Sequence, residues 1–243
     1  MMLPDQIGPF GATIHEVVGA DSPLIEVACQ LFEEIFPEDK RYLPYIQACA
    51  LQRSTSHPRT FDHVWLIKQS GDWVGLRIFS HITTRAFGHG AYIGFRNAYR
   101  GSGLGGWLVK QTLSQLDADA RQFGFPYSLG YLVEVERPVD SEDEKKREKD
   151  EQRLRFHKQC GGIILPVSFT EPVMIEGVDY LQPSDLVGEE PRPMHLILIP
   201  SQQGAQHLHL DLVDLVEGLY YDVYRLPKGH PFVERAISHL TGD

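Results

Sequence analysis

The sequence has few of the features that mark membrane, secreted and metal-binding proteins. Its 243 residues contain no run close to the roughly 20 apolar residues that cross a bilayer, and the first residues lack a basic region followed by an apolar core. It has three cysteines and no CxxC spacing, so neither a disulfide framework nor a cysteine zinc site is expected. These absences predict a cytoplasmic protein with reduced thiols, no membrane partner and no bound metal.

Basic side chains are also scarce relative to acidic ones. The chain has 23 Lys and Arg against 33 Asp and Glu, a formal net charge of −10. Such a surface repels nucleic acid and favours a cationic partner. The remaining composition, 42% hydrophobic and 23% charged, is ordinary for a globular protein, and the length suits one large domain or two small ones.

Apolar residues recur at spacings that predict a mixed α/β fold. A period of three to four residues favours helices, and β-branched or aromatic runs favour strands. The strongest strands, 64–68 and 73–79, flank the turn 69–72 and predict a hairpin. Helices are expected over 21–37, 42–51, 104–124, 140–159, 208–219 and 231–240, and further strands over 7–18, 91–96, 127–136, 162–167 and 194–199.

One stretch combines glycines with a positive charge. Tyr99–Trp107 contains four glycines and Arg100 between an expected strand and an expected helix. Glycine lets the backbone turn sharply with its amides exposed, and the first turn of a helix adds free N–H donors and a positive dipole end. The stretch therefore predicts a phosphate-binding loop, although a glycine turn that only starts a helix fits the same residues.

Three kinds of phosphate-binding loop fit this description. A Walker loop ends in Gly-Lys-Ser/Thr, and Trp107 after Gly106 excludes it. Gly101, Gly103 and Gly106 satisfy GxGxxG, but a dinucleotide site needs a βαβ unit with an acid about 20 residues on, whereas the preceding strands read as an antiparallel hairpin.

The third kind is the Arg-x-x-Gly-x-Gly loop of the GCN5-related N-acetyltransferases (GNAT), which this sequence resembles. Arg100–Gly105 matches that loop, and Ala91–Phe95 stands where the family has a splayed strand. Arg155–Gly161 is similar to the family's Phe-Tyr-x-x-x-Gly signature, with His157 at the tyrosine position. The resemblance implies a mixed, mostly antiparallel sheet flanked by helices, and acetyl-CoA as cosubstrate.

The resemblance also implies which residues bind the coenzyme. The loop amides would bind its pyrophosphate, the main chain of the preceding strand would pair with the pantetheine arm, and the N–H of Phe95 would polarise the thioester carbonyl. Asp150 stands where the family often has an asparagine near that arm. The expected coenzyme-binding residues are Ile93, Gly94, Phe95, Arg100, Gly101, Ser102, Gly103, Leu104, Gly105, Gly106 and Asp150.

Candidate catalytic residues lie on the neighbouring elements. His157 could protonate the leaving thiolate or be structural, and Tyr131 is an alternative donor. Glu134 and Glu136 are two apart on one strand, so both side chains face the same way. Either could accept the amine proton through water, bind a cationic amine or simply be solvated.

The helix 140–159 is the most charged segment. Ser141 and Glu144 have capping-box spacing, and i,i+4 pairing is expected for Glu142 with Lys146, Asp143 with Arg147 and Glu151 with Arg155. A solvated face explains these charges, and contact with the acceptor is the alternative. His207, His209 and Asp211 read as a helix surface more readily than as a metal site, because no further ligand has suitable spacing. Asp39–Tyr42 stands where the resembled family has a wall of the acceptor site, and a solvated turn is the alternative.

Two segments are expected, a GNAT domain over 1–200 and a helical extension over 201–243 that packs on the core, with cleft cover or dimer contact as alternatives. The proline- and acid-rich stretch 168–193 predicts a long loop or inserted hairpin. The resemblance implies acetyl transfer to a primary amine of a small molecule or peptide, and a homodimer is possible. The alternatives are another acyl donor, and a non-catalytic coenzyme A sensor.

Overall fold

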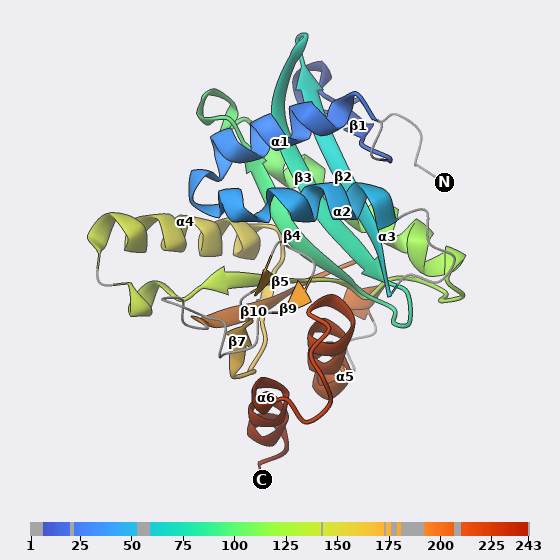
Figure 1. Cartoon of the computed structure of the whole chain (residues 1–243), viewed down its shortest axis with the longest axis vertical. Helices are drawn as coiled ribbons and strands as arrows, with labels where there is room; N and C mark the ends of the chain where they lie inside the picture. Colours follow the sequence, from blue (N-terminus) through green and yellow to red (C-terminus); the bar gives the residue numbers. More distant parts are fainter. Residues whose placement is uncertain are drawn as a thin grey trace.

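The computed structural model describes residues 7–19, 22–52, 59–141, 143–172, 174–175, 179–180, 192–206 and 210–242. An eight-stranded sheet runs through it in the order β1-β2-β3-β4-β5-β10-β6, with β7 also paired to β10 (Figure 1). The strands are β1 Thr13–Glu16, β2 Thr60–Gln69, β3 Asp72–Ile82, β4 Gly88–Phe95, β5 Gly130–Glu136, β6 Ile163–Ile164, β7 Phe169–Glu171 and β10 Arg192–Pro200; Met174–Ile175 (β8) and Asp179–Tyr180 (β9) form a separate hairpin.

Helices cover both faces of this sheet. They are α1 Leu24–Ile35, α2 Leu43–Gln52, α3 Leu104–Gln122, α4 Glu144–Gln159, α5 Leu212–Glu217, the π-helix η7 Gly218–Val223 and α6 Pro231–Thr241. No helix among the described residues is long and apolar enough to cross a membrane. The mixed, mostly antiparallel fold class predicted from the sequence is confirmed.

The predicted hairpin is β2 with β3. Its strands are longer than the apolar runs alone indicated, because the ladder continues from Thr60 opposite Ile82 to Gln69 opposite Asp72. The tight turn depends on Gly71, whose φ of +93° lies in the left-handed region. The hairpin lies between β1 and β4 in the sheet.

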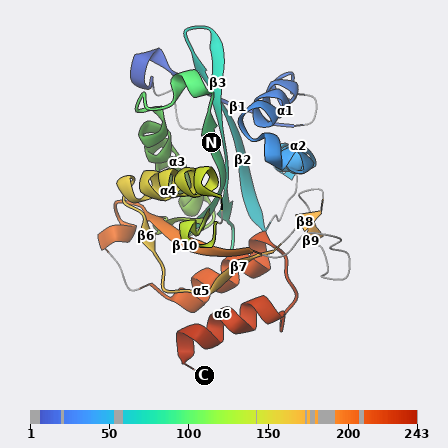
Figure 2. The same cartoon turned by 90° about the vertical axis from the view of Figure 1, so that its left-hand side faces the viewer.

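The two faces of the sheet are covered differently. One face packs against α3 and the apolar residues Leu154 and Phe156 of α4. The opposite face packs against α1 and α2 over the half formed by β1–β4, and against α5, η7 and α6 over β5 and β10. Figure 2 shows α3 and α4 on one side of the sheet and α1 and α2 on the other, with α5 and α6 beneath β10.

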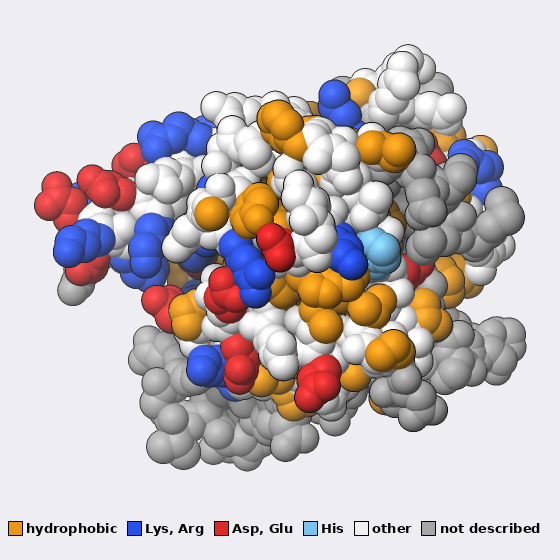
Figure 3. Space-filling model, turned by 90° about the horizontal axis from the view of Figure 1, so that it is seen from above, with side chains coloured by type: hydrophobic (Ala, Val, Ile, Leu, Met, Phe, Trp, Pro, Cys, Tyr) orange, Lys and Arg blue, Asp and Glu red, His pale blue; other side chains and the backbone are white. Residues whose placement is uncertain are grey.

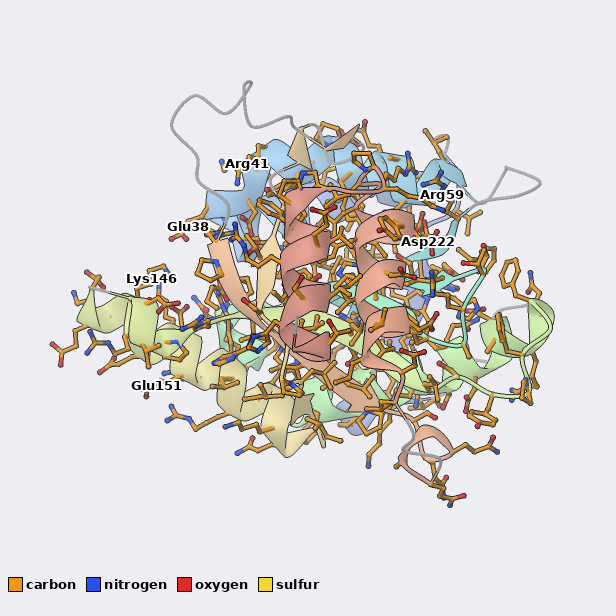
Figure 4. All side chains as sticks on the ribbon, turned by 90° about the horizontal axis from the view of Figure 1, so that it is seen from below. Glu38, Arg41, Arg59, Lys146, Glu151 and Asp222 are labelled. Carbon is orange, nitrogen blue, oxygen red and sulfur yellow. The ribbon has the colours of Figure 1, made fainter. Side chains whose placement is uncertain are left out.

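A charged clamp fastens the C-terminal helices to the core. Arg85, in the turn between β3 and β4, contacts Asp214 and lies 3.2 Å from the Asp222 carboxylate. Arg59 donates to the main-chain oxygen of Tyr221 at 2.9 Å, and Figure 4 shows Arg59 and Asp222 on the same side of these helices. The apolar core shared with β5 and β10 and this clamp together fix residues 210–242 to the sheet.

Several local expectations need correction. The capping box is wrong: Asp143, not Ser141, is the N-cap of α4 and accepts from the Lys146 amide. Arg147 donates to the Ser141 carbonyl instead of pairing with Asp143. The strand expected over 162–167 is only Ile163–Ile164, since Ile197 and Leu198 of β10 pair with just those residues.

Other local expectations are confirmed or lie outside the described residues. The Glu151–Arg155 pair is present at 3.7 Å. Gly124 follows the end of α3 with φ +90°, as expected for a helix stop. Within the described part of 168–193 the structure has β7 and the β8–β9 hairpin. Glu142, His207 and His209 lie outside the described residues.

Candidate functional site

The site begins where β4 and β5 separate. These strands are parallel, and their pairing consists of Gly88 with Tyr131 and His89 with Leu132. Beyond that point residues 90–95 and 133–136 diverge, an opening that we call the splay. The helix α3 follows β4, and its N-terminus lies beyond the wide end of the splay.

The free edge of β4 faces into the splay. The Arg96 N–H donates to the Val74 carbonyl of β3. The ladder between the two strands continues with Gly94 opposite Leu76 and Tyr92 opposite Ile78. In an antiparallel ladder alternate residues direct their N–H and C=O to opposite sides. Ile93 and Phe95 therefore direct theirs away from β3, toward β5, as a ligand pairing with this strand would require.

The loop between β4 and α3 is shaped by two glycines. Gly101 has φ +76° and Gly103, the N-cap of α3, has φ +84°, so both are in the left-handed region that favours glycine. No side chain caps α3, which leaves the amides of its first turn as donors. The Ser102 hydroxyl donates to the Tyr99 carbonyl at 2.6 Å and holds the loop closed.

Arg100 adds a full positive charge to this loop. Its Nε donates to the Phe95 carbonyl at 3.1 Å, which ties the loop to the end of β4. The residue is exposed, and none of the carboxylates that the structure describes forms an ion pair with it. A charged guanidinium beside uncapped helix amides fits a bound phosphate or pyrophosphate.

The next two glycines have different surroundings. A Cβ at Gly105 would lie 2.8 Å from the Phe156 ring, so this glycine lets α4 pack closely against α3. A Cβ at Gly106 would meet no atom within 4 Å. Gly106 thus leaves the first turn of α3 open to a ligand, while Gly105 has a packing role.

A buried arginine lies at the narrow end of the splay, on the face covered by α3. Arg77 of β3 is 1% exposed, and its guanidinium stacks over the Tyr131 ring at 4.8 Å. It donates to the Tyr92 carbonyl at 3.2 Å and to Thr112 Oγ1 at 3.3 Å, whereas Nη2 has no partner among the described residues. Arg77 was not predicted as a site residue from the sequence, although an arginine inside the apolar run 73–79 is unusual.

The predicted acid candidates lie beside this arginine. Burial lowers the pKa of His157 to about 4, helped by the positive charges of Arg77 and Arg153. His157 is therefore a neutral imidazole near pH 7, able to donate one hydrogen bond but carrying no extra proton. Burial raises the pKa of Tyr131 to about 12, so that phenol also stays neutral.

Glu134 lies on the opposite face of the sheet, within a hydrogen-bonded trio. Its Oε2 is 3.0 Å from His89 Nε2, and its Oε1 accepts from the Tyr224 hydroxyl at 3.0 Å. Burial would raise the pKa of Glu134, but His89 and Tyr224 outweigh burial and lower it below its usual value. Glu134 is thus an ionised carboxylate with both oxygens engaged, one by His89 of β4 and one by Tyr224, the residue that follows η7.

Glu136 and Asp150 are joined through α4. Glu136 forms an ion pair with Arg153, which lowers the pKa of Glu136 against the effect of burial. Asp150 is 1% exposed, accepts from the Ser141 hydroxyl at 2.7 Å, and lies 3.7 Å from Arg153. Each carboxylate has a protein partner that accounts for its position.

Farther from the splay, the charges of α4 are solvated at its outer end. The outer part of α4, where Lys146 and Glu151 are labelled, extends beyond the rest of the molecule (Figure 4), and acidic and basic side chains mix at that end of the molecular surface (Figure 3). Residues 39–42 belong to a 3-10 helix after α1, where Arg41 lies over the Tyr42 ring at 4.7 Å. Within the described residues no group of three His, Cys, Asp or Glu side chains could hold a metal.

Comparison with known proteins identifies the fold. No protein-family model matches the sequence, and no curated protein matches it. Solved structures do match. A Bacteroides thetaiotaomicron protein assigned to the GNAT family of acetyltransferases has a TM-score of 0.55 and 18% identity, with 88% of this chain and 99% of that chain covered. Spermidine N-acetyltransferase from Vibrio cholerae has a TM-score of 0.51 and 8% identity, with 80% and 98% covered.

The chain therefore has the GNAT fold. The glycine loop, the free edge of β4 and the α4 residues of the second motif meet around the splay. Sequence reasoning did not find Arg77, His89 or Tyr224. The last two come together with Glu134 only through contacts between residues 45 and 90 positions apart.

Proposed function

We propose that the protein transfers an acetyl group from acetyl-CoA to a primary amine by direct attack of the amine. The observation that carries this proposal is the combination of a strand edge facing the splay with an uncapped, positively charged helix start at its wide end. The Vibrio cholerae protein of this fold was solved with CoA and spermine, which supports both the cosubstrate and an amine acceptor. When bound, acetyl-CoA supplies an activated acyl thioester.

Each part of the site has a role in this proposal. The amides of residues 101–106 and the Arg100 guanidinium bind the pyrophosphate. The main chain of Ile93, Gly94 and Phe95 aligns the pantetheine arm, and the Phe95 N–H polarises the thioester carbonyl. Arg77, a buried cation with a free N–H, favours negative charge near the narrow end of the splay.

The proton donors and acceptors of this reaction are assigned from the charge states of their side chains. His157 and Tyr131 are neutral donors beside Arg77, so either can hydrogen-bond to a departing thiolate. Glu134 and Glu136 are ionised carboxylates on the opposite face, where a cationic amine is attracted. Because these carboxylates are already engaged by the protein, a coenzyme A sensor without catalysis is the second candidate function.

Coenzyme binding and turnover separate the two candidates. Thermal shift and calorimetry with coenzyme A test binding, and release of free thiol from acetyl-CoA with a panel of primary amines tests transfer. We expect both for the native chain. Binding with no release for any amine or acyl donor would favour the sensor, and no binding would refute the phosphate loop.

A charge reversal tests the loop itself. Arg100→Glu should weaken coenzyme binding at least tenfold, because a full negative charge replaces a positive one beside the pyrophosphate. Arg121→Glu, an equally exposed change at the far end of α3, is the matched control and should bind normally. Equal affinities for the two variants would contradict the role of Arg100.

A further inference from the structure

We propose that His89 is the base that accepts the proton of the attacking amine, that Glu134 orients it, and that Tyr224 of the C-terminal helices holds Glu134 in place. This inference rests on the proposed function, since it assigns the proton carrier of that reaction. It rests on the hydrogen-bonded trio on the face of the sheet opposite Arg77.

The hydrogen bonds define which atom of the trio is free. An ionised carboxylate can only accept, so His89 Nε2 is the donor to Glu134 and the neutral ring carries its lone pair on Nδ1. That Nδ1 has no hydrogen-bond partner among the described residues, and the residue is only 5% exposed. A buried lone pair without a donor is costly to a fold and is suited to an incoming N–H.

Glu134 is less suited to be the base. Both of its oxygens are occupied, by His89 and by Tyr224, at 3.0 Å each. Its low pKa makes it a weak proton acceptor near neutral pH. The same contacts make it an effective anchor, because a carboxylate fixed at both ends sets the ring orientation and the tautomer of the histidine.

His89 also lies at the right point along the sheet. It is the last residue of β4 that pairs with β5 before the splay, opposite Leu132. A Cβ at the preceding residue, Gly88, would meet Leu116 of α3, so the side chain of His89 is directed to the other face. The narrow end of the splay therefore has Arg77 on one face and His89 on the other.

The proton balance is simple. One proton of the substrate ammonium moves to His89 Nδ1, and the freed nitrogen pair forms the new bond to the acyl carbon of an acyl-CoA thioester as the carbon–sulfur bond breaks. The sulfur keeps the bonding pair and takes the second proton lost by the nitrogen. His89 then returns its proton to water, while Glu134 remains ionised throughout.

Other charged groups near the trio belong to neighbouring strands. Glu171 of β7 is ion-paired with Arg192 of β10 at 2.8 Å, and burial raises the pKa of Glu171 to about 7. Glu136 of β5 is paired with Arg153. As pH falls, Glu171 takes up a proton before Glu134 does, because the pKa of Glu134 is lowered, so Glu134 keeps the negative charge that accepts the His89 N–H.

Three variants and one control test the assignment. His89→Gln keeps an amide donor for Glu134 but removes the base, and should lower kcat at least 100-fold with unchanged coenzyme affinity. Its profile of kcat against pH should also differ from that of the native chain, because the proton acceptor is gone. Glu134→Gln and Tyr224→Phe should change this profile as well, with smaller losses of kcat and little change in KM. His239→Gln, on the exposed face of α6, should behave as the native chain.

Nitrogen NMR provides a readout that does not need turnover. In the native chain His89 should appear with a protonated Nε2 and an unprotonated Nδ1, and Glu134→Gln should disturb that tautomer. Native kcat and pH dependence in His89→Gln, or a proton on Nδ1 in the neutral ring, would overturn the assignment. Failure of the native chain to bind coenzyme A would instead overturn the proposed function, a separate result from the same samples.

Discussion

Two buried histidines on adjoining strands, His63 and His81, show that the pKa of a buried imidazole depends on its hydrogen-bond partners. His63 of β2 lies between Glu16 at 2.6 Å and Asp119 at 2.9 Å, and these bonds raise its pKa against the effect of burial. His81 of β3 has no hydrogen-bond partner for either ring nitrogen among the described residues, and burial lowers its pKa to about 4. Partners at both ring nitrogens therefore favour the protonated form of His63, whereas burial without partners favours the neutral form of His81.

His81 should make the fold sensitive to acid. Its folded pKa lies below the unfolded value of about 6.5, so as pH falls the unfolded chain takes up the proton first and stability is lost between about pH 6.5 and 4. His81→Phe keeps the stacking on Phe123 and should stabilise the protein at pH 5 more than at pH 7, by up to about 2 kcal/mol. Urea unfolding at both values measures this.

The comparison has an internal control. His157, whose pKa is also about 4, remains in the His81→Phe variant, so some acid sensitivity should persist. His239→Gln changes an exposed histidine and should leave the pH dependence as it is. An equal gain at pH 5 and pH 7 would show that His81 acts through packing alone.

The helix α4 is joined to the segment before it through one buried carboxylate, Asp150. Asp150 bonds the Ser141 hydroxyl, and Lys146 Nζ lies 3.3 Å from the same oxygen. Asp150→Leu should cost roughly 2 to 3 kcal/mol, because the buried Ser141 hydroxyl loses its acceptor. Faster hydrogen exchange over residues 144–150 should accompany the loss.

A milder change separates this structural role from coenzyme binding. Asp150→Asn keeps an acceptor for Ser141 and should leave coenzyme affinity unchanged while stability falls by about 1 kcal/mol. Glu151→Gln, its exposed neighbour, is the matched control. A drop in coenzyme affinity without a loss of stability would instead support the role that the GNAT resemblance gave to Asp150.

Local elements were predictable from the sequence, and long-range ones were not. The β2–β3 hairpin and α3 depend on nearby residues: a glycine turn and an apolar period of three to four. The N-cap of α4 is Asp143 and not the expected Ser141, because the Ser141 hydroxyl donates to Asp150, nine residues further along the chain. The glycine loop after β4 was predicted from a contiguous motif, whereas His89, Glu134 and Tyr224 come from three distant segments that no local pattern connects.

At the scale of the molecule, the C-terminal helices are part of the core. Arg85 contacts Asp214 and Asp222, and lies 3.9 Å from Glu217. Arg85→Met should destabilise the fold by roughly 2 kcal/mol, since each charge-assisted hydrogen bond contributes on that scale, and limited proteolysis should then cut within 210–242 first. Arg235→Met, exposed on α6, is the control. Unchanged melting and proteolysis would show that apolar packing alone holds this segment.

The short contact between β4 and β5 has a thermodynamic consequence. Only two residue pairs join the strands β1–β4 to the strands β5–β10 within the described sheet. A ligand that bonds to the free edge of β4 while touching β5 would act as a substitute strand and close the sheet. Coenzyme binding and cooperative folding of the two half-sheets would then be one linked equilibrium. Bound coenzyme would raise the free energy of unfolding of the whole sheet.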